Sequence, residues 1–128
     1  MGIFNQFLSR KSKVEQIVLP WNILNELNQL EEIINISHSK PVAIFKHSTR
    51  CGISRMVLRN FEKSFHIPTD ILEIYYLDLL EYREISNAVA ATFQIRHQSP
   101  QLLILKNGVT VYTASHNDIQ AADLMNFV

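Results

Sequence analysis

The dipeptide Asn107-Gly108 constrains the fold of this chain more than any other feature. It separates two short apolar segments, QLLIL at residues 101–105 and VTVYT at residues 109–113. Both central residues of the tightest hairpin turn need a positive φ, a conformation that asparagine and glycine adopt more readily than other residues. The sequence therefore predicts two neighbouring antiparallel strands joined at this turn.

The segments before the hairpin alternate between helix-like and strand-like patterns. Apolar residues recur every three or four positions over residues 21–36, which predicts an amphipathic helix. Two short apolar runs have the length and the branched and aromatic residues of buried strands, and an amphipathic helix follows each. In chain order, these are a strand over 41–47, a helix over 52–65, a strand over 71–79 and a helix over 82–93. A last helix is expected over about 117–127.

This order of elements predicts the fold class. A strand, a helix and a second strand in succession imply a parallel pair joined by a right-handed crossover. The hairpin then adds antiparallel strands to the same sheet. We therefore predict an α/β protein with the thioredoxin fold, in which helices flank a mixed four-stranded sheet.

The length and composition fit one such domain. With 128 residues, of which 47% are hydrophobic, the chain can bury a substantial core. We expect a short leader over residues 1–20 and a thioredoxin-like domain over residues 21–128, acting as a monomer or weak dimer. Twelve basic residues balance twelve acidic ones, so no global charge favours a nucleic acid or an anionic membrane as partner. No apolar run approaches the roughly 20 residues of a membrane span.

Cys51 is the single cysteine, which excludes an internal disulfide and favours a cytoplasmic location. It lies between the predicted strand over 41–47 and the predicted helix over 52–65. The N-terminus of a helix stabilises a thiolate, the nucleophilic form of cysteine, through unpaired N–H groups and the helix dipole. The sequence thus predicts a reactive thiol, the alternative being a buried structural one. Basic residues expected around it are Lys46, His47, Arg50, Arg55, Arg59 and His97.

Ser54 stands three residues after the cysteine, where a Cys-x-x-Cys protein has its second thiol. A serine in the first turn of a helix commonly caps backbone groups, and its hydroxyl also suits a hydrogen bond to a thiolate. It cannot resolve a mixed disulfide. The chain is therefore expected to hand such an adduct to another thiol.

Five motifs in one order carry a resemblance to a known family: KHSTRCGIS, REISN, IRHQSPQ, KNG and TASHNDI. From about Lys40 to Ile119 the chain resembles the monothiol bacilliredoxins, thioredoxin-fold proteins tied to the low-molecular-weight thiol bacillithiol. The resemblance implies that the active cysteine attacks a protein-bacillithiol mixed disulfide, takes the bacillithiol and frees the protein thiol. It also implies bacillithiol as co-substrate, bacillithiolated proteins as partners and no bound cofactor.

The resemblance extends to individual residues. Cys51 matches the nucleophile and Ser54 the residue that replaces a resolving cysteine. Ser99-Pro100 matches the cis-proline loop that faces the active thiol in thioredoxin folds. The residues expected to support the thiolate are Arg50, Gly52 and Ser54, and those expected to contact the substrate are His47, Thr49, Arg55, His97, Ser99 and Pro100.

Two other interpretations stay open. The family usually has proline after the cysteine, whereas this chain has Gly52, and the resulting CGIS is similar to the active sequence of monothiol glutaredoxins. Those proteins bind glutathione and can bridge an iron-sulfur cluster, but the chain lacks the glycine pair and aspartate that follow their hairpin. The other interpretation is a thioredoxin-fold binding module without turnover, because a fold does not fix a function.

The remaining polar residues carry weaker signals. The five histidines show no metal-ligand spacing with Cys51, so no metal is expected. Asp78 and Glu81 indicate the start of a helix rather than an acid/base pair. Arg55 and Arg59 share a helical face, which either faces solvent or binds carboxylates of bacillithiol.

Overall fold

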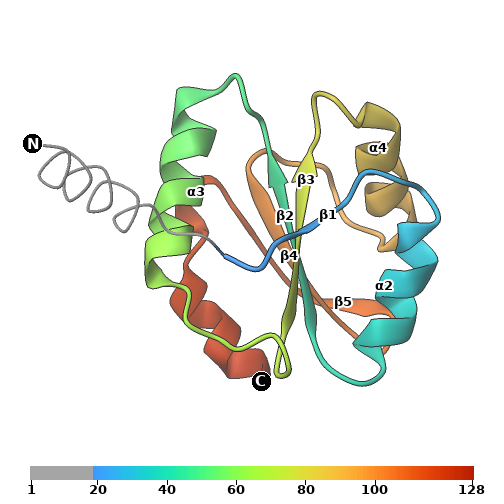
Figure 1. Cartoon of the computed structure of the whole chain (residues 1–128). Coiled ribbons are helices and arrows are strands. Elements are labelled where there is room, and N and C mark those ends of the chain that lie inside the picture. Colours follow the sequence, from blue (N-terminus) through green and yellow to red (C-terminus); the bar gives the residue numbers. More distant parts are fainter. Residues whose placement is uncertain (1–18) are drawn as a thin grey trace, which may run out of the picture.

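The computed structural model describes residues 19–128 (Figure 1). Residues 1–18 of the predicted leader lie outside this range. From residue 42 to residue 115 the helices and strands follow the predicted order. The elements before the C-terminal segment are β1 (Asn22–Ile23), α2 (Gln29–Ser37), β2 (Val42–His47), α3 (Gly52–Ser64), β3 (Glu73–Asp78), α4 (Arg83–Thr92), β4 (Gln101–Lys106) and β5 (Val109–Ser115).

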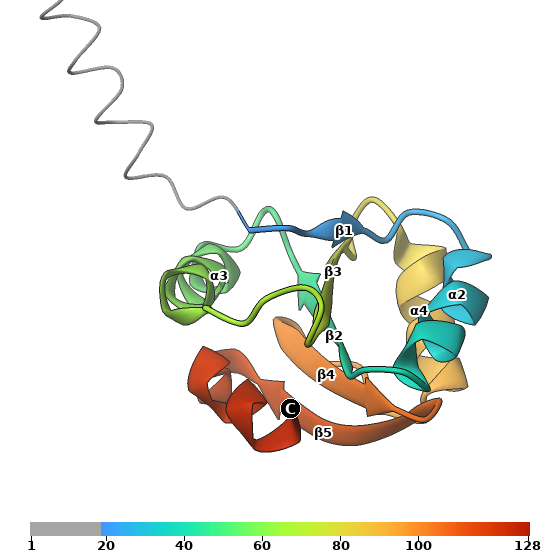
Figure 2. The same cartoon turned by 60° about the horizontal axis from the view of Figure 1, so that its bottom comes forward.

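Five strands form one mixed sheet in the order β1-β3-β2-β4-β5. Strand β2 pairs in parallel with β3 and antiparallel with β4, and β4 pairs antiparallel with β5. Helices α2 and α4 cover one face of the sheet, while α3 and the C-terminal segment cover the other (Figures 1 and 2). This is the predicted thioredoxin-like arrangement, with one strand more than expected.

The additional strand is β1, and it corrects the helix predicted over residues 21–36. Only the part from Gln29 onward is helical, whereas β1 pairs in parallel with β3. The N–H of Leu24 continues this pairing by donating to the carbonyl of Tyr76 (2.9 Å). Trp21 stacks on Phe61 of α3, with 5.9 Å between the ring centroids. The residues at the start of the predicted helix therefore pair with β3 or pack against α3 instead of forming a helix.

The predicted hairpin turn is confirmed. Asn107 and Gly108 both have positive φ, 53° and 78°. The N–H of Asn107 donates to the carbonyl of Ser37 (2.8 Å), and the N–H of Gly108 donates to the Ser37 hydroxyl (2.8 Å). The tip of the hairpin is thereby fastened to the end of α2. Val111 has no partner in the β4 register, which marks a β-bulge in β5.

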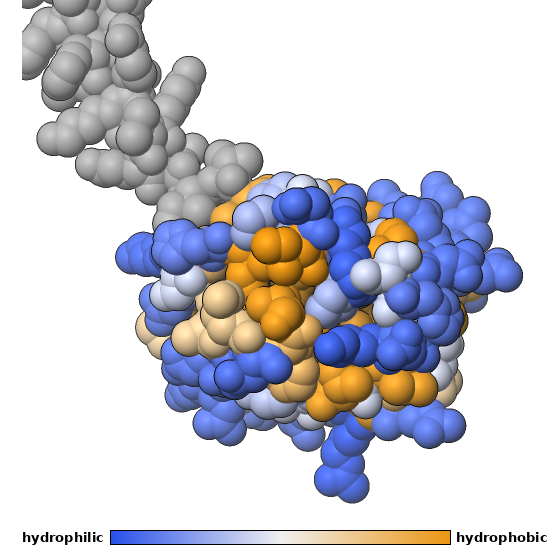
Figure 3. Space-filling view, turned by 90° about the horizontal axis from the view of Figure 1, so that it is seen from below, coloured by the Kyte–Doolittle hydropathy of each residue, from blue (hydrophilic) through white to orange (hydrophobic). Residues whose placement is uncertain are grey.

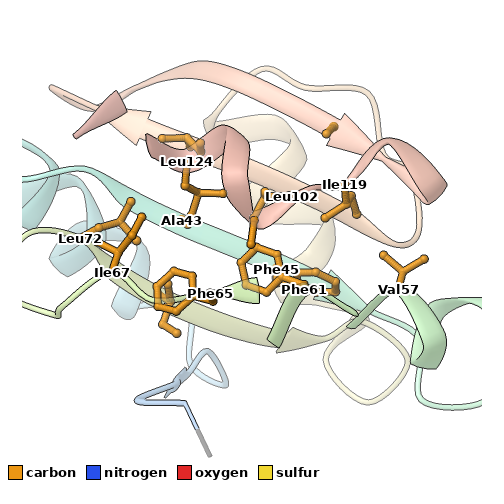
Figure 4. Packing of buried hydrophobic residues seen from close by; sticks show 14 residues of the cluster. Ala43, Phe45, Val57, Phe61, Phe65, Ile67, Leu72, Leu102, Ile119 and Leu124 are labelled. Carbon is orange, nitrogen blue, oxygen red and sulfur yellow. The ribbon is translucent and has the colours of Figure 1, made fainter. Parts of the chain in front are cut away.

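Strand β2 separates two hydrophobic clusters. Its residues alternate between the faces of the sheet, so Ala43 and Phe45 belong to the cluster with α3, and Val42 and Ile44 to the cluster with α2 and α4. Figure 4 shows the first cluster, in which the rings of Phe45 and Phe61 lie together, 5.2 Å between centroids. Because both faces are buried, the start of α3 is held firmly relative to the end of β2.

The chain ends in two 3-10 helices, η1 (His116–Asp118) and η2 (Ala121–Phe127), where one helix was predicted over about 117–127. Ile119 and Gln120 between them have extended backbone. Ile119 is buried in the cluster with α3. The extended backbone at Ile119 and Gln120 interrupts the helix and lets the Ile119 side chain pack in the cluster with α3. The prediction of a single helix is therefore wrong.

The two ends of the sheet differ in character. Strands β2 and β3 are parallel and end at the same edge, so the loops that follow them leave side by side at the top of Figure 1. At the opposite end, seen from below in Figure 3, apolar side chains gather near the centre of the face and polar ones surround them. In the described part of the chain, no helix combines the length and apolar character that crossing a membrane requires.

Candidate functional site

Cys51 is the residue immediately before the first turn of α3, where the sequence predicted it. Its backbone is extended, with φ −102° and ψ 122°. Its N–H donates to the carbonyl of Ser48 (3.2 Å), and its carbonyl accepts the N–H of Arg55 (3.1 Å). The thiol is free and half-buried. It is therefore accessible to a partner sulfur at the positive end of a helix dipole.

Ser54 lies in the first turn of α3 and is fully buried, with 0% of its surface exposed. Its hydroxyl oxygen accepts the N–H of Ser48 (3.1 Å) and lies 2.7 Å from Nδ1 of His47. These two bonds tie the start of α3 to the end of β2. Within residues 19–128 the hydroxyl bonds to these two groups and not to the Cys51 thiol. Of the two roles predicted for Ser54, it has the bond to a backbone N–H.

His47 ends β2 and is also buried, with 3% of its surface exposed. Burial lowers the pKa of its imidazole most, while the Asp78 carboxylate raises this pKa and the Arg55 guanidinium lowers it. The neutral ring is thus favoured, and its Nδ1 can accept the hydrogen of the Ser54 hydroxyl. The prediction that His47 contacts the substrate needs correction, because so buried a ring reaches Ser54 and not a ligand at the surface.

Two buried polar side chains on neighbouring strands hold the loop that precedes β4. Lys46 of β2 faces Gln101 of β4 in the antiparallel register. The Lys46 ammonium group donates to Nδ1 of His97 (2.7 Å). The Gln101 amide donates to the carbonyl of Arg96 (2.9 Å) and accepts the N–H of Gln98 (3.3 Å). We call Lys46 and Gln101 the loop clamp.

The clamped loop ends in Ser99-Pro100, whose peptide bond is cis. Pro100 is buried and Ser99 is half-buried. The carbonyl of Pro100 accepts the N–H of His116 (3.0 Å), which links the loop to the residue after β5. His97 itself is exposed, and since Lys46 occupies its Nδ1, its Nε2 is the ring nitrogen left for a ligand.

Sequence reasoning placed Lys46 near the thiol but missed the loop clamp. The available signal was a lysine inside the apolar run of residues 41–47 and a glutamine at the start of the apolar run of residues 101–105. Long polar side chains are rarely fully buried without a partner. Their pairing depends on the register between β2 and β4, which the sequence does not specify.

Lys46 gives the stability of the protein a pH dependence above neutrality. Burial, and then the Arg83 guanidinium, lower its pKa from 10.5 to about 8. Between these values the unfolded chain binds more protons than the folded chain, so stability rises with pH. We expect the free energy of unfolding to increase by about 2 kcal/mol from a pH of about 7.5 to about 9.5. Urea denaturation at both pH values measures this increase, which Lys46→Met should lack; an equal increase in the variant would contradict the assignment.

Gly52, the departure from the family's usual proline, is the first residue of α3. A Cβ here would meet only the Arg55 guanidinium, at 3.9 Å, an ordinary contact. Proline suits this position because the N–H that it removes has no partner inside the helix. We expect Gly52→Pro to raise the free energy of unfolding by about 0.4–1 kcal/mol, since it restricts the unfolded chain.

Chemical denaturation of the wild type and of Gly52→Pro measures this change. The matched control is Gly108→Ala, which should lower stability because its φ of 78° strains any residue with a Cβ. A lower stability of Gly52→Pro would show that the first turn of α3 depends on the N–H of Gly52.

The remaining predicted site residues lie at the surface around the thiol. Thr49, Arg50 and Arg55 are exposed, as are the apolar side chains of Ile53 and Met56 on α3. The structure thus brings together Cys51 and the exposed residues of the β2–α3 loop, and it keeps Ser54 and His47 in the interior. Within residues 19–128 no group of three or more histidine, cysteine, aspartate or glutamate side chains is placed to hold a metal ion.

Solved structures share this fold. A protein described as a candidate oxidoreductase with a thioredoxin fold is 31% identical, with 81% of this chain and 89% of that chain covered and a TM-score of 0.69. The thioredoxin of Malassezia sympodialis is 22% identical, covers 88% of this chain and 93% of its own, and has a TM-score of 0.64. The thioredoxin of Fasciola hepatica is 19% identical, with 82% of this chain and 93% of that chain covered and a TM-score of 0.62. The two thioredoxins show the fold alone.

A family comparison adds what the fold cannot. The family described as monothiol bacilliredoxin BrxC matches residues 22–124, which include β1, the Cys51 region, the cis-proline loop and most of η2. Together with the oxidoreductase-like neighbour, this match supports a redox function of the thiol. Because the match spans most of the chain, the protein belongs to the monothiol bacilliredoxin family.

Proposed function

We propose that this protein removes bacillithiol from mixed disulfides between bacillithiol and other proteins. The observation that carries the proposal is the pair of residues at the start of α3. Cys51 is a half-buried free thiol, and the position that would hold a resolving thiol is a fully buried serine, Ser54. Family membership supports bacillithiol as the co-substrate. The reaction suits a reducing cytoplasm, where a lone thiol is not lost to a stable disulfide.

The reaction is a thiol-disulfide exchange. The Cys51 thiolate attacks the bacillithiol sulfur of the mixed disulfide, and the bond between that sulfur and the client sulfur breaks. The electron pair leaves with the client sulfur, which becomes a thiolate, while Cys51 becomes disulfide-bonded to bacillithiol. Ser54 cannot displace this adduct. A second low-molecular-weight thiol must attack it, which restores Cys51 and releases a small disulfide.

The buried residues support these steps by fixing geometry. Ser54 and His47 bond the start of α3 to the end of β2, so the thiol keeps its place at the edge of the sheet. The loop clamp of Lys46 and Gln101 fixes the loop that ends in Pro100. The exposed guanidinium of Arg50, the residue before Cys51 in the chain, favours an anionic substrate.

The proposal is tested by following adduct transfer with intact-mass measurements. One client protein is prepared with a bacillithiol adduct and, separately, with a glutathione adduct, and each is incubated with the chain. We expect the bacillithiol to leave the client and to appear on the chain. Cys51→Ser should abolish the transfer, whereas Ser54→Ala should retain most of it. Transfer from the glutathione adduct but not from the bacillithiol adduct would overturn the proposal and favour a glutaredoxin-like protein.

A further inference from the structure

The loops that follow β2 and β3 border a hollow whose lining includes Arg50, the residue before Cys51 in the chain. In parallel sheets, ligands commonly bind outside the carboxyl ends of neighbouring strands. His47 and Asp78, the last residues of β2 and β3, are partners in the parallel register. The N–H of Leu79 donates to the carbonyl of His47 (3.1 Å), so the two loops start from one fixed point. Figures 1 and 2 both show these loops at the same edge of the sheet.

This hollow has a volume of about 440 Å³ and lies between the two loops. Thr49 and Arg50 line it on the side of Cys51, and Asp78, Leu80 and Glu81 line it on the side of α4. Arg50 directly precedes the nucleophile in the chain. A larger hollow, about 710 Å³, lies along β5 and is lined by none of the residues 47–56. The smaller one therefore has the better position for a group bonded to the Cys51 sulfur.

In the described part of the chain, the charged side chains that line the hollow form no ion pair with one another. It holds one cation, Arg50, and two carboxylates, Asp78 and Glu81. Within residues 19–128 the ion pair is between Lys40 and Glu73, at the other end of the sheet. Opposite charges that share a hollow without pairing are free to bind a ligand that carries both signs.

Asp78 also has a fixed direction. Its Oδ1 accepts the N–H groups of Leu80 (3.1 Å) and Glu81 (3.4 Å), which orders the loop before α4. Asp78 thus orders the turn before α4 but does not cap the helix, whose N-cap is Tyr82 and has no side-chain hydrogen bond. The exposed side chain of Leu80 adds an apolar part to the lining. The wall opposite Arg50 is therefore a preformed acidic surface with an apolar part.

We propose that this hollow, which we call the thiol pocket, binds the low-molecular-weight thiol through both its charges. A carboxylate of the ligand pairs with Arg50, and an ammonium group pairs with Asp78 and Glu81, while its sulfur meets Cys51. The ligand class is a small zwitterionic thiol with an amine and a carboxylate. This rests on the proposed function in that Cys51 exchanges with such a thiol, and it assigns Asp78, Leu80 and Glu81 to the site.

The test uses two probe thiols that each carry one of the charges. Cys51 is first converted to its mixed disulfide with 5-thio-2-nitrobenzoate. A probe thiolate then attacks the Cys51 sulfur, the old disulfide bond breaks, and coloured 5-thio-2-nitrobenzoate leaves with the electron pair. The probes are 3-mercaptopropionate, which is anionic, and cysteamine, which is cationic. Each rate constant is divided by that of the same probe with the free aromatic disulfide, which removes the intrinsic reactivity of the probe.

We expect a crossed pattern in two neutral variants at low salt. Arg50→Gln should slow 3-mercaptopropionate about two- to fivefold, the range of an exposed ion pair, and should not slow cysteamine. Glu81→Gln should slow cysteamine by a similar factor and should not slow 3-mercaptopropionate. The matched controls are Lys63→Gln and Glu84→Gln, two exposed residues that do not line the pocket. Both controls should leave the ratio of the two probes unchanged.

The outcomes separate this inference from the proposed function. The thiol pocket would be overturned if each variant slowed both probes equally. It would also be overturned if the control variants changed the ratio of the two probe rates as much as Arg50→Gln and Glu81→Gln do. A crossed pattern without any transfer of bacillithiol would support the pocket and overturn the proposed client reaction. Transfer of bacillithiol without a crossed pattern would keep the proposed function and reject the pocket.

Discussion

Ser54→Cys is expected to resolve a mixed disulfide on Cys51 that the wild type should retain. Residues 51 and 54 lie one helical turn apart at the start of α3, a spacing that allows a disulfide. The new thiol would take the place of a hydroxyl that lies 2.7 Å from Nδ1 of His47, so its proton has an acceptor. Its thiolate would attack the Cys51 sulfur, form an internal disulfide and release the small thiol.

Intact-mass measurement after reaction with a small disulfide distinguishes the two behaviours. The wild type should keep the adduct on Cys51. Ser54→Cys should show almost none, together with the loss of two hydrogens that an internal disulfide causes. Ser54→Ala is the control, because it removes the hydroxyl without adding a thiol, and it should keep the adduct. A stable adduct on Ser54→Cys would show that the first turn of α3 holds the two sulfur atoms apart.

Phe61→Ala is expected to cause the largest loss of stability among single substitutions in α3. Phe61 is 2% exposed, and its ring lies near those of Trp21, Phe45 and Phe65, with centroid separations of 5.9, 5.2 and 5.6 Å. Removing such a ring costs its transfer free energy and leaves a cavity, about 3–5 kcal/mol together. The loss of aromatic contacts acts in the same direction.

Urea denaturation of the wild type and the variant measures this loss. The matched control is Met56→Ala, because Met56 is 49% exposed on the same helix and should change stability by no more than about 0.5 kcal/mol. A change below about 1 kcal/mol for Phe61→Ala would show that the cluster of Figure 4 repacks around the missing ring. Cys51 precedes α3 and lies ten residues before Phe61, so the thiol should stay reactive in the folded fraction of the variant.

The sequence predicted the parts of the fold that depend on local patterns. The hairpin follows from the conformational freedom of Asn107 and Gly108, and the central strands follow from short apolar runs between helices. Strand β1 was missed because two residues are too few for a strand pattern. In addition, Trp21 and Leu24 fit a helical spacing, although Trp21 packs on α3 and Leu24 hydrogen-bonds to β3. The break at Ile119 was missed because burial against α3 overrides the helical pattern.

The candidate site was predictable where it depends on neighbours in the chain. Cys51 at the start of α3, with Arg50 before it and Ser54 after it, is readable from the sequence. The burial of His47 was not, because alternation along a strand does not reveal which face is covered at its last residue. The loop clamp and the thiol pocket were not, because each joins residues from strands whose register only the folded chain defines.

The residues around Cys51 differ in how easily they can be substituted, because some are buried and others are exposed. Lys46, His47 and Ser54 are buried, and each bonds to another side chain, so an exchange at one of these positions also requires a new partner. Thr49 and Arg50 are exposed and contribute little to packing. Under the proposed function, combinatorial libraries at Thr49 and Arg50 should therefore change the selectivity for a small thiol while the bonds of the three buried residues stay in place.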